Sequence, residues 1–519
     1  MTNGTNRGEI TPEINTNRRK HRLGRSSQAR NTSWYLLSPS FWIALCCLSL
    51  MPMVSIGLWA QETKIFRAGA STSNVTPPLG GILVGGYGAP VANHIHDELH
   101  ARSLVLDDGQ SKLVFVLVDN VAINREVFDE AKRRIQRDTG IPESHMLMAA
   151  THTHSATSAS GLGEKRRGWN FEQPLDDYQN FVVSRIVDGV KIAINNLEPA
   201  QIGWGSGQVP QHVFNRRWKM KPGTPTPNPL GSQDKVVMNP GVGNPNLLEP
   251  AGPTDPEVYF LSLRSIAGKP IALLANYSLH YVGGVPSDHV SADYFAVFAD
   301  RIQELLGADR QDPPFVGIMS NGTSGDVNNI NFGGAAEKNA PYEKMNKVAD
   351  DVAKEVYRVQ QTLEYRDWVS LQAVQSEITL QVRKVSPDLV ARSEMVMGRP
   401  DSVKPVHSLE KIYAQRVLQF HKEWPDKIEI VLQTFGIGDL GIAAIPFEVF
   451  TEIGLEIKSK SPFEDTFTIE LANGSYAYLP TPEQHELGGY ETWITTNRVE
   501  TRASEKIVDE LMNLFGSLK

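Results

Sequence analysis

Two histidines stand one residue apart in the stretch AATHTHSATSASG, residues 149–161. They follow the apolar run HMLMAA, and alternate side chains of an extended chain share a face, so His152 and His154 point the same way. Ligands of open α/β sheets bind just beyond the carboxyl ends of strands. The small residues that follow leave space for a bound molecule. The stretch indicates a metal or proton-transfer site, and two hydrogen-bonded structural histidines would explain it equally well.

Three other predicted strands end in groups that can bind a metal. The run IALLANYSLH ends at His280, GIAAIPFE ends at Glu448, and TFTIELANGSYAY leads to Tyr476 and Tyr478. Each has an ordinary interpretation alone: a capping histidine, a glutamate that opens a helix, and aromatic strand residues. Together, two histidines, a carboxylate and a phenol form a nitrogen and oxygen set suited to Zn²⁺, with room for a water.

A glycine-rich loop, SNGTSGDVNN, follows the predicted strand FVGIMS at residues 320–329. Its backbone N–H groups can approach an anion or a developing oxyanion. Ser324 is a candidate nucleophile, but the stretch is not a G-x-S-x-G elbow, and a tight structural turn is the favoured interpretation. The residues that we expect to contribute to this oxyanion or substrate loop are Gly322, Ser324, Gly325, Asp326 and Asn328.

Short apolar runs alternate with amphipathic helical patterns along the chain, as in strands joined by crossover helices. The clearest unit is KLVFVLVD (112–119), a helix capped by Asn124, and then HMLMAA, which predicts a parallel strand pair. Further strands are predicted at 257–266, 271–279, 315–320, 368–382 and 441–447, and helices at 179–196, 292–306, 343–363, 408–423 and 503–517. We predict an α/β fold with layered, mixed, partly parallel β-sheets and crossover helices in a single large catalytic domain.

The catalytic domain is expected to span residues 61–519, with an insertion at 219–256 that is dense in Pro, Gly and Asn. This composition predicts a long loop over the sheet edge that acts as a lid, and a disordered insertion without function is the alternative. The remaining chain shows no internal repeat.

The first 60 residues have the layout of an export signal. Residues 1–34 form a basic region that includes NRRKHRLGRSSQAR, and 35–60 form a signal peptide or signal anchor around FWIALCCLSLMPMVSIGLWA (41–60). Cleavage after Ala60 is favoured, because Pro52 interrupts the apolar run and polar residues follow Ala60. Without cleavage, residues 41–60 would associate with a membrane. The protein is therefore expected to be exported to the periplasm, the extracellular space or a membrane surface.

Composition limits the chemistry and the partners. Both cysteines, Cys46 and Cys47, lie in the signal segment, so a metal site in the mature chain must use His, Asp, Glu or Tyr. The formal net charge of −8 argues against nucleic-acid binding. The expected partner is a small-molecule or lipid substrate, and the sequence does not predict an oligomeric state.

Over most of residues 66–500 the chain resembles the neutral/alkaline non-lysosomal ceramidase family. The segments that carry the resemblance occur in the family's order and are AATHTHS, ANYSLH, SNGTSGDVNN, IPFEVFTEIG and YAYLPTPEQHELGGYE. The resemblance implies a secreted or membrane-anchored zinc amidase of sphingolipid metabolism that hydrolyses ceramide to sphingosine and a fatty acid. It further implies that zinc is held by His152, His280, Glu448 and Tyr478, and that His154 lies beside the metal as a polar partner of the reacting group. Arg216, in VFNRRW, would face the substrate.

The sequence also departs from the family pattern. Asn328, in GDVNNI, stands where the family has a serine regarded as catalytic, and an amide cannot supply that hydroxyl. We also expect no counterpart of the family's C-terminal immunoglobulin-like domain.

The predicted function is a secreted, zinc-dependent, ceramidase-like amide hydrolase in which metal-activated water attacks the acyl carbon and His154 carries the proton to the leaving group. Tyr478 or N–H groups of the loop would stabilise the oxyanion, and this route needs no serine. One alternative is the same scaffold acting on another acylated or polysaccharide-derived compound, and another is a non-catalytic, metal-containing, secreted binding protein. A deep, narrow, apolar pocket would indicate a lipid substrate, and a broad polar cleft would indicate the first alternative.

Overall fold

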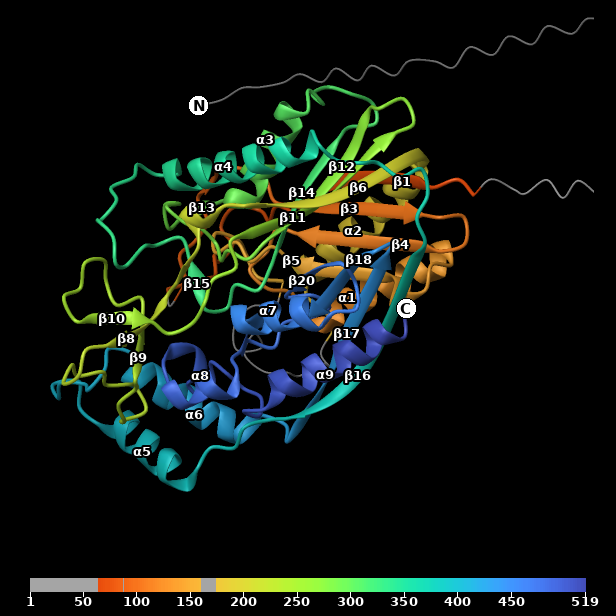
Figure 1. Ribbon diagram of the computed structural model, residues 1–519. Helices are drawn as coiled ribbons and strands as arrows, with labels where there is room; N and C mark the ends of the chain where they lie inside the picture. Colours follow the sequence, from red (N-terminus) through yellow and green to blue (C-terminus); the bar gives the residue numbers. More distant parts are fainter. Residues whose placement is uncertain (1–63, 87, 160–173) are drawn as a thin grey trace, which may run out of the picture. The chain divides into compact units, whose positions relative to one another are not determined.

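The computed structural model describes residues 64–86, 88–159 and 174–519. These residues form one compact unit built on an eight-stranded and a four-stranded sheet (Figure 1). The larger sheet contains, in spatial order, β14 (Val316–Asn321), β12 (Pro270–Tyr277), β11 (Glu257–Ser265), β6 (Glu198–Gln208), β1 (Arg67–Asn74), β3 (His100–Asp107), β4 (Lys112–Val118) and β5 (Met146–Ala150). The smaller sheet contains β16 (Leu371–Gln381), β17 (Lys427–Ile437), β18 (Leu440–Ile445) and β20 (Asp465–Glu470). The predicted α/β fold with mixed sheets is confirmed.

The two sheets pack face to face around a shared apolar core. In β4, Phe115 and Leu117 enter this core, whereas Val116 and Val118 point to the opposite face, as the two-residue period of a strand requires. In β18, Ile442 belongs to the shared core in the same way. Because both faces of such strands are buried, their sequences are apolar throughout.

Helices cover the two outer faces, so the unit has four layers. The outer face of the larger sheet is covered by α1 (Arg125–Thr139), α2 (Asp177–Asn195), α3 (Tyr294–Leu305) and α4 (Glu343–Gln360). The smaller sheet packs against α6 (Glu410–Glu423), α7 (Thr451–Lys460) and α9 (Ala503–Gly516), and α5 (Pro387–Gly398) lies beside α6. In Figure 1, α3 and α4 lie at the top, and α9 lies beside β16 and β17.

Three parallel strand pairs, each joined by a helix, bring loop segments to the edges of the two sheets. They are β4–α1–β5, β12–α3–β14 and β18–α7–β20. The first is the predicted unit, and α1 begins after Asn124, although the Asn124 side chain makes no capping hydrogen bond and instead donates to Glu126. The candidate site residues follow the carboxyl ends of these strands, where ligands of α/β sheets bind.

Short strands complete the fold. Residues 219–256 carry β9 (Val236–Met238) and β10 (Leu247–Pro250), which form a three-stranded sheet with β8 (Arg217–Met220). Two-stranded pairs are formed by β2 (His94–Ile95) with β13 (His289–Val290), β7 (Phe214–Asn215) with β15 (Val327–Asn328), and β19 (Glu448–Val449) with β21 (Tyr478–Leu479). The latter two pairs hold candidate site residues.

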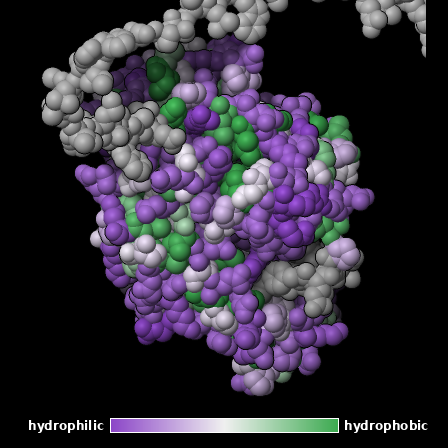
Figure 2. Space-filling view, turned by 90° about the vertical axis from the view of Figure 1, so that its right-hand side faces the viewer, coloured by the Kyte–Doolittle hydropathy of each residue, from purple (hydrophilic) through white to green (hydrophobic). Residues whose placement is uncertain are grey.

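The predicted signal regions, 1–34 and 35–60, lie outside the described residues. Within the described part of the chain, no helix combines the length and the apolar character that crossing a bilayer requires. On the face shown in Figure 2, hydrophobic residues form small, separate groups among hydrophilic ones.

Candidate metal centre

Three imidazole rings converge where β5 and β12 end. His152 Nε2 lies 3.1 Å from His280 Nε2 and 3.1 Å from His154 Nε2, and the nearest ligand atoms of the three residues all lie within 4.8 Å of one another. His152 and His280 are buried, and His154 is half-buried. His152 also has a positive φ of 72°, a conformation that costs free energy in a residue other than glycine. Such strain is typical of functional sites.

In His152 and His280, the hydrogen bond of Nδ1 determines whether Nε2 carries a proton. His152 Nδ1 lies 2.6 Å from the Val121 carbonyl oxygen, and His280 Nδ1 lies 3.1 Å from the Ser324 carbonyl oxygen. Because a carbonyl oxygen only accepts, we assign the proton of each neutral ring to Nδ1. The two Nε2 lone pairs then face each other and repel, and a cation or a proton between the rings removes that repulsion. This pattern, with Nδ1 bonded to a carbonyl, is typical of histidines that bind metals.

Glu448 and Tyr478 are register partners in the parallel pair β19–β21. Glu448 Oε2 lies 3.4 Å from His152 Nε2 and, among the described residues, accepts no hydrogen bond although it is buried. Burial raises the pKa of Glu448, but the nearby His152 more than offsets this effect. The pKa of Glu448 is therefore lowered overall, and the carboxylate stays ionised. Burial likewise opposes protonation of His152, and the Glu448 charge raises the pKa of His152. A buried carboxylate oxygen facing imidazole nitrogens fits a nitrogen and oxygen site for zinc.

His154 stacks on Tyr281, with ring centroids 3.8 Å apart. Gly85 also lies against His154: a Cβ at position 85 would be 2.6 Å from His154 Cβ, so only glycine fits. Burial, followed by the nearby His152, lowers the pKa of His154 well below its usual value. His154 is therefore a neutral imidazole at pH 7.

Arg216 makes its hydrogen bonds to protein groups. Its Nε donates to Glu491 Oε1 at 2.9 Å, and its Nη2 donates to the Gly325 carbonyl at 2.8 Å and to the Tyr478 hydroxyl at 3.1 Å. Glu491 is fully buried and also accepts from Arg217 at 2.6 Å. Arg216 is thus a buried support of Tyr478, which differs from the substrate-facing position that the resemblance implies.

The glycine-rich loop also supports the site, which corrects the expected oxyanion role. The N–H groups of Gly322, Ser324 and Gly325 already donate to Tyr277, Glu470 and Val449, respectively. A hydrogen bond donor that is occupied by a protein acceptor cannot bind an oxyanion without breaking that bond.

Ser324 lies behind His280, where it cannot act as the nucleophile. Its hydroxyl donates to Glu470 Oε1 at 2.5 Å and lies 3.3 Å from His280 Nδ1, on the side of the ring away from His152. Burial raises the pKa of Glu470 to about 8.

The other two loop residues bind neighbouring segments. Asp326 Oδ1 accepts from the Thr451 backbone N–H and hydroxyl, both at 2.8 Å, and its Oδ2 accepts from Asn215. Asn328 donates to Asn239 Oδ1 at 2.9 Å. These contacts tie the loop to β7, to α7 and to the residue after β9, and they do not involve the histidines.

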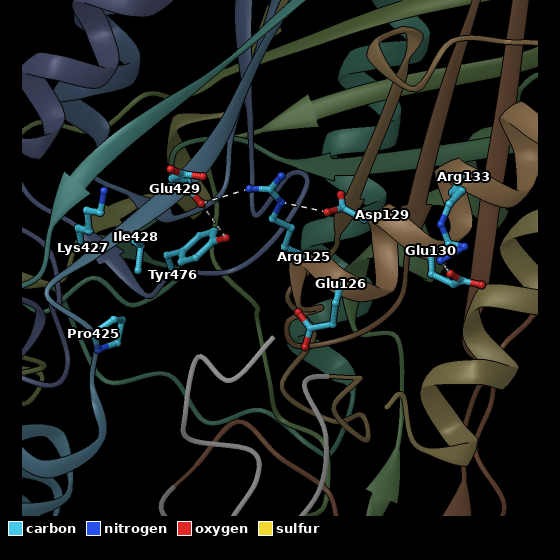
Figure 3. Close-up of a pocket in the computed structure, with 10 residues that line it drawn as sticks. All are labelled: Arg125, Glu126, Asp129, Glu130, Arg133, Pro425, Lys427, Ile428, Glu429 and Tyr476. Carbon is cyan, nitrogen blue, oxygen red and sulfur yellow. Dashed lines mark hydrogen bonds and ion pairs between the residues drawn. The ribbon is translucent and has the colours of Figure 1, made fainter. Parts of the chain in front are cut away.

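Tyr476 and Tyr478 line two different cavities. A cavity of about 450 Å³ is lined by Glu448 and Tyr478. Tyr476 lines a different cavity of about 630 Å³, drawn in Figure 3, where its hydroxyl donates to the Glu429 carbonyl. In that second cavity Arg125 pairs with Asp129, and none of the three histidines lines it. Of the two tyrosines, Tyr478 therefore shares a cavity with Glu448 and Tyr476 does not.

Three supporting residues were not predicted. Glu470 is the last residue of β20, and a carboxylate at the end of a predicted strand is a signal that sequence analysis could have used. Glu491 lies in the tyrosine segment that carries the resemblance, but the sequence gives no sign that it binds two arginines. Tyr281 follows His280 directly.

Comparisons with known proteins identify similar chains. Residues 66–362 match the family model for the N-terminal region of neutral/alkaline non-lysosomal ceramidases, which is more than half of the 519 residues. A solved ceramidase complexed with C2 is 16% identical with a TM-score of 0.65, and the match covers 88% of this chain and 75% of that one. Neutral ceramidase from Pseudomonas aeruginosa is 16% identical with a TM-score of 0.63 and the same coverage. At this identity the structures show a shared fold.

Proposed function

The chain belongs to the neutral/alkaline non-lysosomal ceramidase family, and we propose that it is an exported, zinc-dependent hydrolase of amide bonds. The observation that carries the proposal is the pair of facing Nε2 atoms of His152 and His280, 3.1 Å apart, with the Glu448 carboxylate beside them. Export rests on the basic and apolar N-terminal segments, 1–34 and 35–60.

The residues that would hold zinc are His152, His280, Glu448 and Tyr478. Zinc in such a site supplies a water-derived nucleophile at neutral pH and polarises a carbonyl oxygen. Val121 and Ser324 orient the first two ligands through their carbonyl oxygens. Burial and the Glu448 charge raise the pKa of Tyr478 well above its usual value, and Arg216, held by Glu491, donates to the Tyr478 hydroxyl and opposes that shift.

His154 is the residue that moves the proton. As a neutral imidazole beside His152, it can take the proton of the attacking water while the oxygen adds to the acyl carbon. When the C–N bond breaks, the same proton passes to the leaving nitrogen, which departs as an amine and leaves a carboxylic acid. Such proton transfer contributes about 10²- to 10⁴-fold to the rate.

This route uses no serine hydroxyl. Ser324 is fully buried behind His280, and Asn328 bonds Asn239 instead of a group at the histidines. The asparagine at the position of the family serine is therefore compatible with hydrolysis.

Metal analysis and a substrate panel test the proposal. The mature protein should contain about one zinc per chain, and His152→Ala combined with His280→Ala should remove it. The exposed histidines His94 and His96 provide a matched double substitution that should keep zinc. Full zinc occupancy in the His152/His280 variant would refute the ligands. Zinc binding without turnover of any amide or ester would instead favour the non-catalytic binding protein.

A further inference from the structure

His154 is held differently from the other two imidazoles of the candidate metal centre. The rings of His152 and His280 are each fixed by an Nδ1 atom that lies against a backbone carbonyl oxygen, at 2.6 Å and 3.1 Å respectively. His154 Nδ1 is buried and, among the described residues, makes no hydrogen bond of normal geometry, although the Gly85 backbone favours the protonated ring. Another contact therefore has to hold the plane of the His154 ring.

The Tyr281 ring supplies that contact. It lies flat on the His154 imidazole, with ring centroids 3.8 Å apart and planes inclined by 14°. Stacked aromatic rings attract each other, so the imidazole cannot tilt without losing this contact. Because Nε2 lies in the plane of the imidazole, the stack helps to fix the direction in which His154 Nε2 faces His152 Nε2, 3.1 Å away.

Two polar side chains anchor the backbone at Tyr281. Asn329, from the glycine-rich loop, donates through Nδ2 to the Val282 carbonyl at 2.9 Å and to the Tyr281 carbonyl at 3.4 Å. The buried Asp293 carboxylate accepts from the N–H groups of Val282 and Gly283, at 3.0 Å and 2.8 Å. The chain that carries the ring is therefore held from two directions, which makes the ring a well-anchored surface for the imidazole.

Proton transfer depends on the direction of the His154 ring. In the proposed reaction, His154 Nε2 takes a proton from the attacking water and later gives it to the leaving nitrogen. Both transfers need a hydrogen bond of normal length and angle, so a tilted ring would carry the proton less often. A misplacement of about 1 Å can lower a rate by about 10²-fold. A side chain that fixes the ring can therefore contribute to the rate without touching the substrate.

We propose that Tyr281 is a positioning residue that holds the His154 imidazole in the orientation for proton transfer. The inference rests on the proposed function, because it adds a residue to the machinery of that same site. The ring carries this role and the hydroxyl does not, since the ring makes the contact with His154. Phenylalanine should therefore replace Tyr281, whereas leucine, which is apolar but not flat, should not.

Steady-state kinetics of the zinc-loaded protein test the proposal. Tyr281→Leu should lower kcat for an amide substrate about 10- to 100-fold and leave KM unchanged, because Tyr281 acts through His154 and not on the substrate. Tyr281→Phe should keep kcat within about twofold of the wild type. Wild-type kcat in Tyr281→Leu, or an equal loss in Tyr281→Phe, would overturn the proposal.

A second histidine–tyrosine stack provides the matched control. The Tyr342 ring lies on His96, with centroids 3.7 Å apart and planes inclined by 10°, and neither residue belongs to the candidate centre. Tyr342→Leu should therefore keep the wild-type kcat. Metal analysis of the same preparations is needed because Tyr281 also touches His280, with ring centroids 5.4 Å apart. Loss of zinc in Tyr281→Leu would show that Tyr281 acts on the metal ligand, which would overturn the proposal.

A double-mutant cycle separates positioning from a general structural role. His154→Gln removes the imidazole, so Tyr281→Leu should cause no further loss of kcat in that background. A ring that merely supported the fold would lower kcat in both backgrounds. An equal loss in the presence and in the absence of His154 would therefore overturn the proposal.

Nuclear magnetic resonance of the zinc-loaded protein reports the stack without catalysis. With carbon-13 at histidine Cε1, the signal that is missing from His154→Gln identifies His154. The ring current of Tyr281 should shift the His154 proton signal upfield of that of exposed His421 in the wild type and in Tyr281→Phe, and not in Tyr281→Leu.

The spectrum of the wild type decides the matter even if Tyr281→Leu does not fold. An unshifted His154 signal in the wild type would overturn the proposal. A shifted signal in a protein that binds zinc and cleaves no amide would instead refute the proposed function, while the stack that orients His154 would be supported.

Discussion

Gly325 lies so close to Glu448 that a Cβ at position 325 would be 2.7 Å from the Glu448 carbonyl oxygen. Gly325→Ala should therefore displace β19, destabilise the fold by about 1–3 kcal/mol and weaken zinc binding. Urea unfolding and zinc titration measure the two effects. Gly398→Ala is the control, since a Cβ there meets no atom within 4 Å. Wild-type stability and zinc affinity in Gly325→Ala would show that the contact does not position Glu448.

Removal of the Glu491 charge should destabilise the protein strongly. Glu491 accepts from Arg216 at 2.9 Å and from Arg217 at 2.6 Å, and all three side chains are buried. Glu491→Gln leaves two guanidinium groups without their counterion, which should cost about 3–5 kcal/mol in the free energy of unfolding. Exposed Glu483 provides the control substitution, Glu483→Gln. A cost in Glu491→Gln no larger than that of the control would contradict this account.

His154 should affect the rate and not the metal content. We expect His154→Gln to keep zinc and to lower kcat about 10²- to 10⁴-fold, because the variant loses the group that carries the proton. Metal analysis and steady-state kinetics on the same preparation separate the two effects. His421→Gln, an exposed substitution on α6, serves as the control. If His154→Gln lost its zinc together with activity, His154 would be a ligand instead of a proton carrier.

Zinc should stabilise the folded chain. A ligand that binds only the native state, at 100 times its dissociation constant, adds about 2.7 kcal/mol to the free energy of unfolding. Thermal unfolding of chelated and zinc-loaded protein should therefore show a higher midpoint with zinc. The variant that carries His152→Ala and His280→Ala should show no such shift. Identical midpoints for the two wild-type preparations would argue against a metal centre.

His485 should make the protein sensitive to acid. Burial, with Arg383 and Arg217 nearby, lowers the pKa of His485 from 6.5 to about 3. Between those values the unfolded chain binds a proton that the folded chain does not. This stabilising contribution is therefore complete above pH 6.5 and is lost as the pH falls toward 3, by up to about 1.4 kcal/mol per pH unit.

The His485 contribution can be measured by urea unfolding at pH 7 and pH 5. His485→Asn should lose less stability between these two values than the wild type, because asparagine does not titrate. The same substitution at exposed His421 should leave the wild-type dependence on pH unchanged. Parallel stability curves for His485→Asn and the wild type would contradict the prediction.

Short apolar runs and amphipathic patterns in the sequence predicted several of the strands and helices. The unit from β4 through α1 to β5 was recognised because its strands are apolar on both faces and its helix is amphipathic. The strand ends that deliver His152, His280 and Glu448 were predicted for the same reason. By contrast, β17 was not predicted, because it begins with alternating charged and apolar residues after a polar segment.

Long-range packing could not be predicted. Nothing near Gly325 in the sequence reveals that its N–H donates to Val449, or that its carbonyl accepts from Arg216. A glycine-rich loop signals close backbone approach, but the acceptors of its N–H groups, which are Tyr277, Val449 and Glu470, come from other segments of the chain. The expected oxyanion role of the loop N–H groups could not be checked from the sequence for this reason, and the same holds for the hydrogen bonds that Arg216 makes to Glu491 and Tyr478.

The two sheets contribute different atoms to the candidate centre. The three imidazoles extend from the eight-stranded sheet, whereas Glu448 and Tyr478 come from chain that follows the strands of the four-stranded sheet. A fragment that ends at residue 362, where the family match ends, would keep every nitrogen ligand and lose both oxygen ligands. An ion bound by the imidazoles together with Glu448 and Tyr478 would link the part of the chain in the eight-stranded sheet to the part in the four-stranded sheet. Loss of the ion would therefore indicate that these two parts have moved apart.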